Sequence, residues 1–127
     1  MAKRKVLVIA EVGAIGKMLS MILKSVGCDV EVMEAFGAAD IIEVLKVLSE
    51  KKYDLVVPTN NGMSPMRIPD FIGDIKERDP TMKIFVLSGY HPPDFVKQLW
   101  EKGIDDYMPM PFDVEEFMAR VKTYFPE

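Results

Sequence analysis

The amino-acid sequence predicts an α/β fold, in which helices cover both faces of a parallel sheet. Five short runs rich in β-branched residues alternate with five segments whose apolar residues recur at helical spacing. The first, third and fourth runs are almost continuously apolar, as is typical of strands that are covered on both faces. Because each helical crossover between parallel strands covers one face of the sheet, this alternation predicts a doubly wound sheet in three layers.

The apolar pattern predicts the positions of five strands and of the first three helices. The predicted strands occupy residues 6–10, 30–33, 55–58, 84–87 and 104–108. Gly27 is placed to end the first helix, and the third helix, which follows Pro69, is predicted to be short and weak. The apolar stripes of the first three helices consist of Ile15, Leu19, Ile22, Leu23 and Val26, then of Ile41, Leu45 and Leu48, and then of Phe71 and Ile75.

The last two helices carry clearer boundary signals. Pro93 precedes the fourth helix and Gly103 ends it. Asp113 is a good N-cap residue for the fifth helix, and Glu116 follows three positions later. The two apolar stripes consist of Phe95 and Leu99, and of Phe117, Val121 and Phe125.

Length and composition narrow the classes of function. The 127 residues predict a single domain spanning residues 1–127, with no output domain attached. The single cysteine, Cys28, excludes an internal disulfide and favours the reducing cytoplasm. A net charge of -4 gives no general attraction to nucleic acid, and no apolar run is long enough to span a membrane. We therefore expect a cytoplasmic protein that binds neither nucleic acid nor membrane.

The carboxyl ends of four strands are expected to meet at one edge of the sheet, where open α/β sheets bind ligands. Three sequence motifs lie close to this edge: YDLVV at residues 53–57, VLSG at residues 86–89 and GIDDYMPMPF at residues 103–112. Together with the order of the elements, they resemble the receiver domain of two-component response regulators, most closely the single-domain type related to the chemotaxis regulator. The resemblance covers essentially the full chain. It implies a flavodoxin-like sheet with strand order 2-1-3-4-5 and a role in phosphorelay signal transduction.

The resemblance also implies a phosphorylation pocket, of which three parts are missing here. In the family an aspartate nucleophile ends the third strand, an acidic pair after the first strand helps to hold magnesium, and a lysine precedes the proline after the fifth strand. The acceptor position falls on Thr59, or with a one-residue slip on Asn60. Ala10 replaces one residue of the acidic pair, and Met110 replaces the lysine.

Three other positions of the pocket are retained. Glu11 is the second residue of the acidic pair, Ser88 occupies the hydroxyl position, and Tyr107 occupies the aromatic position. The losses fit one another, because a buried lysine without facing carboxylates would be an unpaired charge. We interpret the chain as a pseudo-receiver that is not phosphorylated on aspartate and has no cofactor. One carboxylate rarely makes a magnesium site, so Glu11 is only a weak metal candidate.

A partner surface is predicted around Trp100, Tyr107 and the last helix, where the family resemblance places a common interface. Trp100 is equally compatible with core packing, since both roles suit a tryptophan on a helix. The expected function is protein–protein interaction in signalling, without enzymatic activity. The expected partner is a histidine kinase or another signalling protein, and the chain itself is expected to be a monomer or a weak homodimer.

Two alternative functions remain at the same strand-end crevice. The first is a binder of a small molecule or nucleotide, which the long segment 59–69 and the neutralised pocket favour. The second is a receiver with an atypical acceptor, either Thr59 or Asp54, although Asp54 begins its strand at the far end from the site. A separate kinase would restore negative charge at Thr59, but a turn threonine that bonds nearby backbone is the simpler interpretation.

Overall fold

A five-stranded parallel sheet forms the centre of the molecule, in a computed structural model that describes residues 3–35, 38–60 and 68–125. The strand order is β2-β1-β3-β4-β5, as predicted. The strands are β1 (Lys5–Ala10), β2 (Asp29–Glu34), β3 (Leu55–Asn60), β4 (Phe85–Ser88) and β5 (Asp106–Pro109). Val8 of the first strand pairs with Val32 on one side and with Val57 on the other, so β1 lies inside the sheet.

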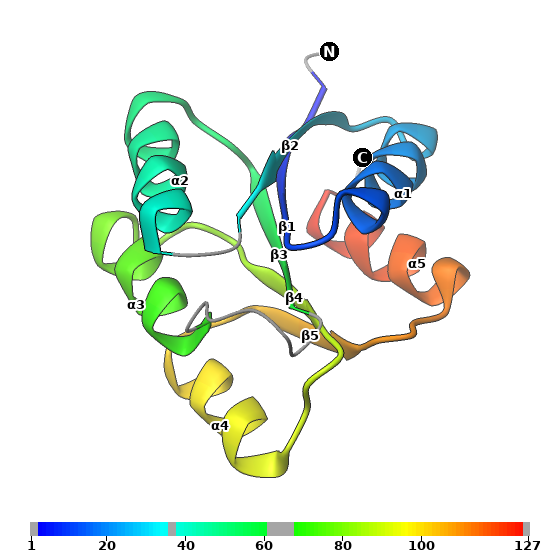
Figure 1. The fold of residues 1–127 in the computed structure, drawn as a ribbon. Coiled ribbons are helices and arrows are strands. Elements are labelled where there is room, and N and C mark those ends of the chain that lie inside the picture. The colour runs from blue at the N-terminus through cyan, green and yellow to red at the C-terminus, as the bar shows by residue number, and fades with distance from the viewer. Residues whose placement is uncertain (1–2, 36–37, 61–67, 126–127) are drawn as a thin grey trace.

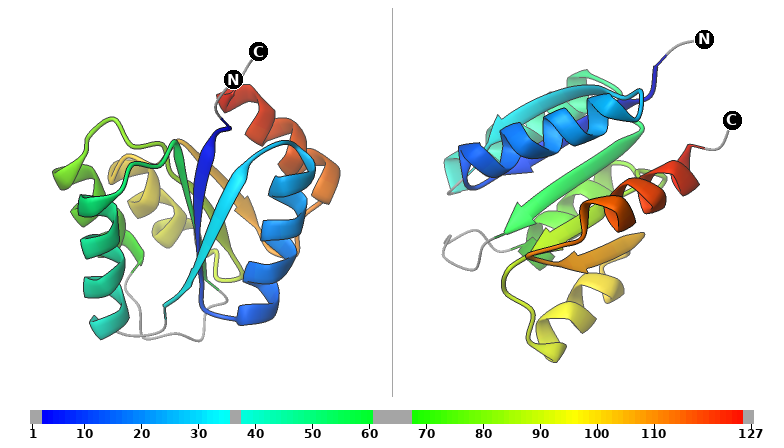
Figure 2. Two further views of the ribbon diagram at one scale, coloured as in Figure 1. Left: turned by 90° about the horizontal axis from the view of Figure 1, so that it is seen from above. Right: turned by 90° about the vertical axis from the view of Figure 1, so that its right-hand side faces the viewer.

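Five helices cover the two faces of this sheet (Figures 1 and 2). They are α1 (Gly13–Ser25), α2 (Ala38–Glu50), α3 (Ile68–Arg78), α4 (Pro93–Glu101) and α5 (Val114–Tyr124). Helices α1 and α5 lie on one face, and α2, α3 and α4 lie on the other. The predicted doubly wound, three-layer fold is confirmed.

Each layer boundary holds its own hydrophobic core. On the face of α2, α3 and α4, the sheet contributes Leu7, Ile9, Val56 and Val86, and Phe71 of α3 packs among them. On the other face, alternate residues of the same strands pack against α1 and α5. They include Val6, Val8, Val57, Phe85 and Leu87 from the sheet and Leu19, Leu23, Phe117 and Val121 from the helices. This double burial explains why the central strands are apolar at nearly every position.

Several element boundaries differ from the predicted ones. Strand β3 continues two residues past Pro58, because Thr59 and Asn60 pair with Leu87 and Ser88 of β4. The fifth strand begins at Asp106, two residues later than predicted. The third helix has 11 residues and four buried side chains, so the prediction of a short, weak helix is wrong.

The predicted ends of α1 and α4 and the predicted start of α5 are confirmed. Gly27 has a φ of +90° and Gly103 a φ of +100°, a conformation that glycine adopts more readily than other residues. At the start of α5, the carboxylate of Asp113 accepts a hydrogen bond of 2.9 Å from the backbone N–H of Glu116. The chain therefore enters and leaves these helices where the sequence predicts.

Candidate functional site

The carboxyl ends of β1, β3, β4 and β5 meet at one edge of the sheet, which we call the strand-end site. Asn60 pairs with Ser88, and the backbone N–H of Met110 donates a 2.7 Å hydrogen bond to the carbonyl of Ser88. Thr59 bonds to the carbonyl of Ile9, which directly precedes Ala10. The structure thus brings the positions inferred from the sequence together at this edge.

Thr59 is held inside the sheet. Its side chain is 1% exposed, and its hydroxyl donates a 3.2 Å hydrogen bond to the carbonyl of Ile9 on the neighbouring strand. The interpretation as a turn threonine is therefore wrong in one respect, because Thr59 lies in β3. In this conformation the hydroxyl is buried and engaged in a hydrogen bond with the neighbouring strand.

Asn60 is the last described residue before residues 61–67. It is 5% exposed, and its carbonyl accepts a short, 2.6 Å hydrogen bond from the N–H of Gly89. This bond ties the end of β3 to the turn after β4. Residues 61–67, which include most of the segment inferred as a ligand loop, lie outside the described residues.

Ser88 uses its hydroxyl within the same turn. The hydroxyl donates a 2.6 Å hydrogen bond to the carbonyl of Tyr90 and accepts one of 3.0 Å from the N–H of Tyr90. These two bonds hold the turn after β4. The ring of Tyr107 is partly buried on the α2–α4 face, and burial raises the pKa of its hydroxyl.

Ala10 and Met110 contribute apolar side chains to the strand-end site, beside the buried polar residues Thr59, Asn60 and Ser88. Ala10 is fully buried, and a side-chain carbon added at Gly16 of α1 would lie only 3.0 Å from its methyl group. Met110 packs against the core on the α1–α5 face. Neither side chain supplies a charge or a metal ligand.

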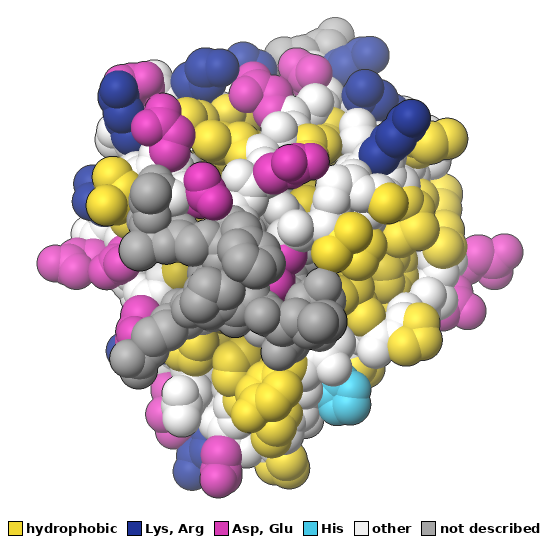
Figure 3. All heavy atoms as spheres, in the orientation of Figure 1, with side chains coloured by type: hydrophobic (Ala, Val, Ile, Leu, Met, Phe, Trp, Pro, Cys, Tyr) yellow, Lys and Arg dark blue, Asp and Glu magenta, His cyan; other side chains and the backbone are white. Residues whose placement is uncertain are grey.

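An apolar cavity of about 460 Å³ opens beside the strand-end site. Met110 lines it together with Ile15, Met18, Gly89, Pro111, Phe112 and Val114. Met18 and Val114 are 40% and 42% exposed, so the cavity opens to a hydrophobic surface. Figure 3 shows hydrophobic side chains gathered over α1 and the start of α5, next to the edge where the strands end. We call this the Met110 cavity.

Glu34 lies next to the site, although the sequence analysis did not select it. It ends β2, and its carboxylate lies so close to Gly13 that a side chain at that position would require the Glu34 side chain to move. Gly13 is the first residue of α1, where partial positive charge accumulates at the helix N-terminus. A carboxylate of the chain itself therefore occupies the surroundings of this helix end.

The carboxylates at this edge do not form a recognisable metal centre. Among residues 3–35, 38–60 and 68–125, no group of three His, Cys, Asp or Glu side chains is placed to hold a metal ion. Glu11 follows β1 and is partly buried.

Among the helices of residues 3–35, 38–60 and 68–125, none has the length and apolar character that a membrane span requires.

The two residues of the predicted partner surface lie in different environments. Trp100 is on α4 and is 48% exposed, so the interpretation as a core residue is wrong. Tyr107 is on β5 and partly buried. Arg120 of α5 donates hydrogen bonds to the carboxylate of Asp106 and to the carbonyl of Tyr107, at 2.9 and 3.1 Å. These bonds join β5 to α5 beside Tyr107.

Comparison with known proteins gives one family match. Residues 6–122 match the model of the response regulator receiver domain. Over 85 residues the chain is 29% identical to the DNA-binding transcriptional regulator NtrC of Proteus hauseri. This match covers 63% of the chain and only 17% of NtrC. Sporulation initiation phosphotransferase F of Bacillus subtilis is 24% identical over 131 residues, which cover 99% of the chain and 97% of that protein.

Solved structures show the same fold at low sequence identity. A CheY-like receiver domain protein from Methanospirillum hungatei superposes with a TM-score of 0.84 at 19% identity, covering 96% of this chain and 93% of that one. A protein described as an atypical orphan response regulator with a phosphorylation-independent regulatory mechanism superposes with a TM-score of 0.77 at 21% identity. That match covers 94% of this chain and 93% of the other.

Proposed function

The chain belongs to the response regulator receiver domain family, and from this premise we propose that it signals through protein contacts without phosphorylation of an aspartate. A receiver domain acts in signal transduction. The further proposal is that this one transmits a signal by binding a partner, and that it catalyses no reaction of its own. A similar fold is found in a response regulator whose described mechanism is independent of phosphorylation.

The environment of Thr59 is the observation that carries this proposal. Aspartyl phosphorylation requires a carboxylate that attacks the phosphoryl group. Here a buried hydroxyl stands at that position, and it already donates to the carbonyl of Ile9. Met110 supports the same conclusion, because it leaves no cation at the lysine position to balance phosphoryl charge.

A phosphodonor assay tests the proposal. The protein is incubated with acetyl phosphate and magnesium, alongside a receiver domain that retains its acceptor aspartate. We expect the second protein to form an acid-stable, hydroxylamine-labile phosphoprotein and this chain to form none. Stoichiometric, hydroxylamine-labile labelling of this chain would disprove the proposal. Labelling that resists hydroxylamine would instead indicate a hydroxyl acceptor such as Thr59.

The proposed partner surface consists of Trp100, Tyr107 and helix α5. A half-exposed tryptophan is a frequent anchor of protein interfaces, because burying it on binding removes a large apolar area from water. The partner we propose is a histidine kinase or another signalling protein, bound by a monomer or a weak homodimer of this chain.

Trp100→Ala tests this surface in a pull-down. We expect the variant to lose a partner that the wild-type protein captures reproducibly. Ile42→Ala is the matched control, since Ile42 is a 67% exposed apolar residue on α2, on a different part of the surface. Equal capture by all three proteins would remove Trp100 from the interface.

The Met110 cavity favours a second candidate function, the binding of a small molecule. Its volume of about 460 Å³ lies in the range of ligand pockets, and its lining is almost entirely apolar. An apolar compound therefore suits it better than a nucleotide. In a thermal-shift screen of apolar compounds, a true ligand would stabilise the wild-type protein but not Met18→Lys, which puts a charge at the rim. Stabilisation of both proteins would place the compound elsewhere.

A further inference from the structure

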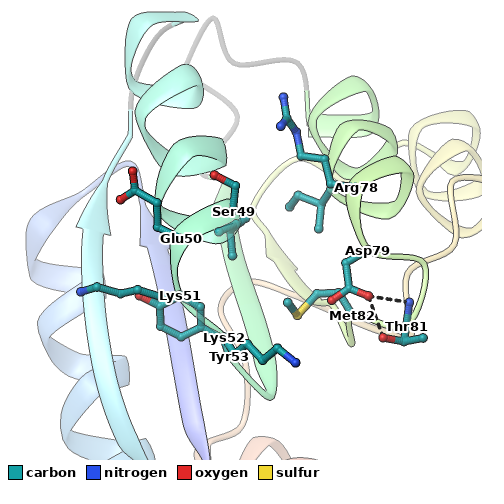
Figure 4. A pocket seen from close by; sticks show the side chains of 11 residues that line it. Ser49, Glu50, Lys51, Lys52, Tyr53, Arg78, Asp79, Thr81 and Met82 are labelled. Carbon is teal, nitrogen blue, oxygen red and sulfur yellow. Dashed lines mark hydrogen bonds between the residues drawn. The ribbon is translucent and has the colours of Figure 1, made fainter.

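A large cavity lies at the opposite edge of the sheet from the strand-end site. It has a volume of about 700 Å³ and lies between the carboxyl-terminal ends of α2 and α3 (Figure 4). Lys52 borders it from the α2 side and Arg78 from the α3 side. Its remaining lining consists of Leu48, Ser49, Glu50, Lys51, Tyr53, Ile75, Asp79, Thr81 and Met82.

A second, smaller cavity of about 260 Å³ continues from it along the same edge. The two cavities share Tyr53, Asp79, Thr81 and Met82 in their linings, so they adjoin one another, and we call the two together the amino-edge groove. The smaller cavity adds Arg4, Asp54, Lys83, Tyr124 and Phe125 to the lining. The groove is therefore elongated and runs beneath the starts of β1, β3 and β4.

The cations of the groove are only partly neutralised by nearby carboxylates. Lys51 pairs with Glu31 at 3.4 Å, and, after the hydrogen bonds from Thr81, the charge of Lys52 contributes to lowering the pKa of Asp79. Among the ion pairs that the described residues form, none involves Lys52 or Arg78. Asp79 accepts hydrogen bonds of 3.0 and 2.6 Å from the backbone N–H and hydroxyl of Thr81. Asp54 accepts one of 2.8 Å from the backbone N–H of Lys5. Asp79 therefore bonds within the turn that follows α3, and Asp54 bonds to the backbone at the start of β1.

Two further cations are held at the smaller end of the groove by aromatic rings. The guanidinium of Arg4 lies 5.5 Å from the centre of the Phe125 ring. The ammonium of Lys83 lies 5.6 Å from the centre of the Tyr124 ring. Cation–π contacts of this kind position a charge without neutralising it.

Interaction with a helix dipole explains the position of only one of these cations. Arg78 is in the last turn of α3, where a cation stabilises the partial negative charge of the helix end. Lys52, Lys83 and Arg4 lie outside the helices. The protein as a whole carries a net charge of -4, whereas the lining of the groove has more cations than carboxylates. The cations are Lys51, Lys52, Arg78, Arg4 and Lys83, and the carboxylates are Glu50, Asp54 and Asp79.

We propose that the amino-edge groove binds an extended acidic segment of a partner protein. Carboxylates of the segment would meet Lys52, Arg78, Lys83 and Arg4, and an apolar side chain would lie on Leu48 and Ile75. The apolar side chains beside the cations suit a peptide that alternates carboxylates with apolar residues better than the uniform charge of a nucleic acid. This surface is separate from the one proposed around Trp100.

A fluorescent peptide tests the proposal on the intact protein. The probe has the sequence Glu-Asp-Leu-Glu-Asp-Leu-Glu-Asp, and its dissociation constant is measured by fluorescence anisotropy at low and moderate ionic strength. The groove variant is Lys52→Glu/Arg78→Glu. The matched control is Lys17→Glu/Lys97→Glu, which makes the same change of charge at two exposed lysines on α1 and α4. We expect the groove variant to weaken binding about tenfold or more and the control variant less than about twofold.

Other outcomes would overturn the proposal in distinguishable ways. Equal weakening by both variants would mean that the peptide responds to net charge alone. Unchanged affinity after both leucines of the probe are replaced by glycine would remove the apolar floor from the site. Tighter, groove-dependent binding of a single-stranded oligothymidylate would indicate nucleic acid instead. Wild-type NMR titration gives an independent check, because the amide signals of Tyr53, Thr81 and Met82 must shift with the peptide.

Discussion

Tyr53 and Glu31 form a polar contact between the segment that precedes β3 and the edge strand β2. The phenolic hydroxyl of Tyr53 donates a 2.9 Å hydrogen bond to the Glu31 carboxylate, and Lys51 lies 3.4 Å from the same oxygen. The hydrogen bond from Tyr53, followed by the charge of Lys51, lowers the pKa of Glu31. Burial and the facing carboxylate raise the pKa of Tyr53. The pair is therefore strongest with Glu31 ionised and Tyr53 protonated.

Tyr53→Phe should lower the free energy of unfolding by about 1 kcal/mol at neutral pH, since one partly buried hydrogen bond is lost. A carboxylate with a lowered pKa stabilises the fold above its unfolded pKa and loses that contribution as the pH falls through its folded pKa. The difference between wild type and variant should therefore shrink between pH 7 and about pH 3. Urea unfolding at both pH values measures it. Tyr90→Phe, at a 48% exposed tyrosine, should change little at either pH.

The placement of the selected residues at the strand ends could be predicted from the sequence, but their environment could not. Ala10, Thr59 and Met110 are recognised by counting along strand motifs, because parallel strands end at one edge. The hydrogen bond from Thr59 to Ile9 depends on how β3 pairs with β1, which no local pattern specifies. Glu34 was missed for the same reason, since β2 and α1 meet only in three dimensions.

Helix α5 illustrates how one residue controls the start of an element. Asp113 precedes it, and its carboxylate satisfies the backbone N–H of Glu116, which has no partner inside the helix. This contact was predictable because the N-cap signal is local in sequence.

Asp113→Ala should lower the free energy of unfolding by about 1 kcal/mol, the usual effect of losing an N-cap side chain. Asp113→Asn keeps the side-chain oxygen that accepts the bond and should retain most of the stability. Thermal and urea unfolding of the three proteins measures this order. Equal loss in the alanine and asparagine variants would mean that the charge, rather than the hydrogen bond, supports the helix.

Helix α3 shows where prediction from local pattern fails. Its buried face consists of Ile68, Phe71, Ile72 and Ile75, and Pro69 lies inside its first turn. Proline is tolerated there because the first N–H groups of a helix have no internal partner. Counting Pro69 as a boundary therefore made the helix appear shorter than it is. Packing against the sheet and α4, which the sequence does not display locally, supplies the rest of its stability.

At the scale of the whole molecule, the α1–α5 face depends on a few aromatic rings. Phe117 is fully buried, and its ring centre lies 5.2 Å from that of Phe85 on β4 and 5.3 Å from that of Phe112. These contacts join α5 to the sheet and to the segment that follows β5. Phe117 therefore contributes to the packing of α5 on two neighbouring segments.

Phe117→Ala should lower the free energy of unfolding by about 3–5 kcal/mol, as expected for a fully buried phenylalanine. Most domains have a stability of only about 5–15 kcal/mol, so the variant should unfold at much lower urea concentration. Val114→Ala, at a 42% exposed position of the same helix, should change stability by less than about 0.5 kcal/mol. A small effect of Phe117→Ala would show that α5 is not needed to hold this face together.

The sheet order also has a consequence for synthesis on the ribosome. Strand β1 emerges first and takes a place inside the sheet, and β3, β4 and β5 then add outward in the order in which they are translated. The face formed by Val57, Phe85 and Leu87 still lacks one of its two covering helices at that stage. It is completed only when the 11 residues of α5 leave the exit tunnel. Until then, the nascent chain presents a broad apolar surface to chaperones.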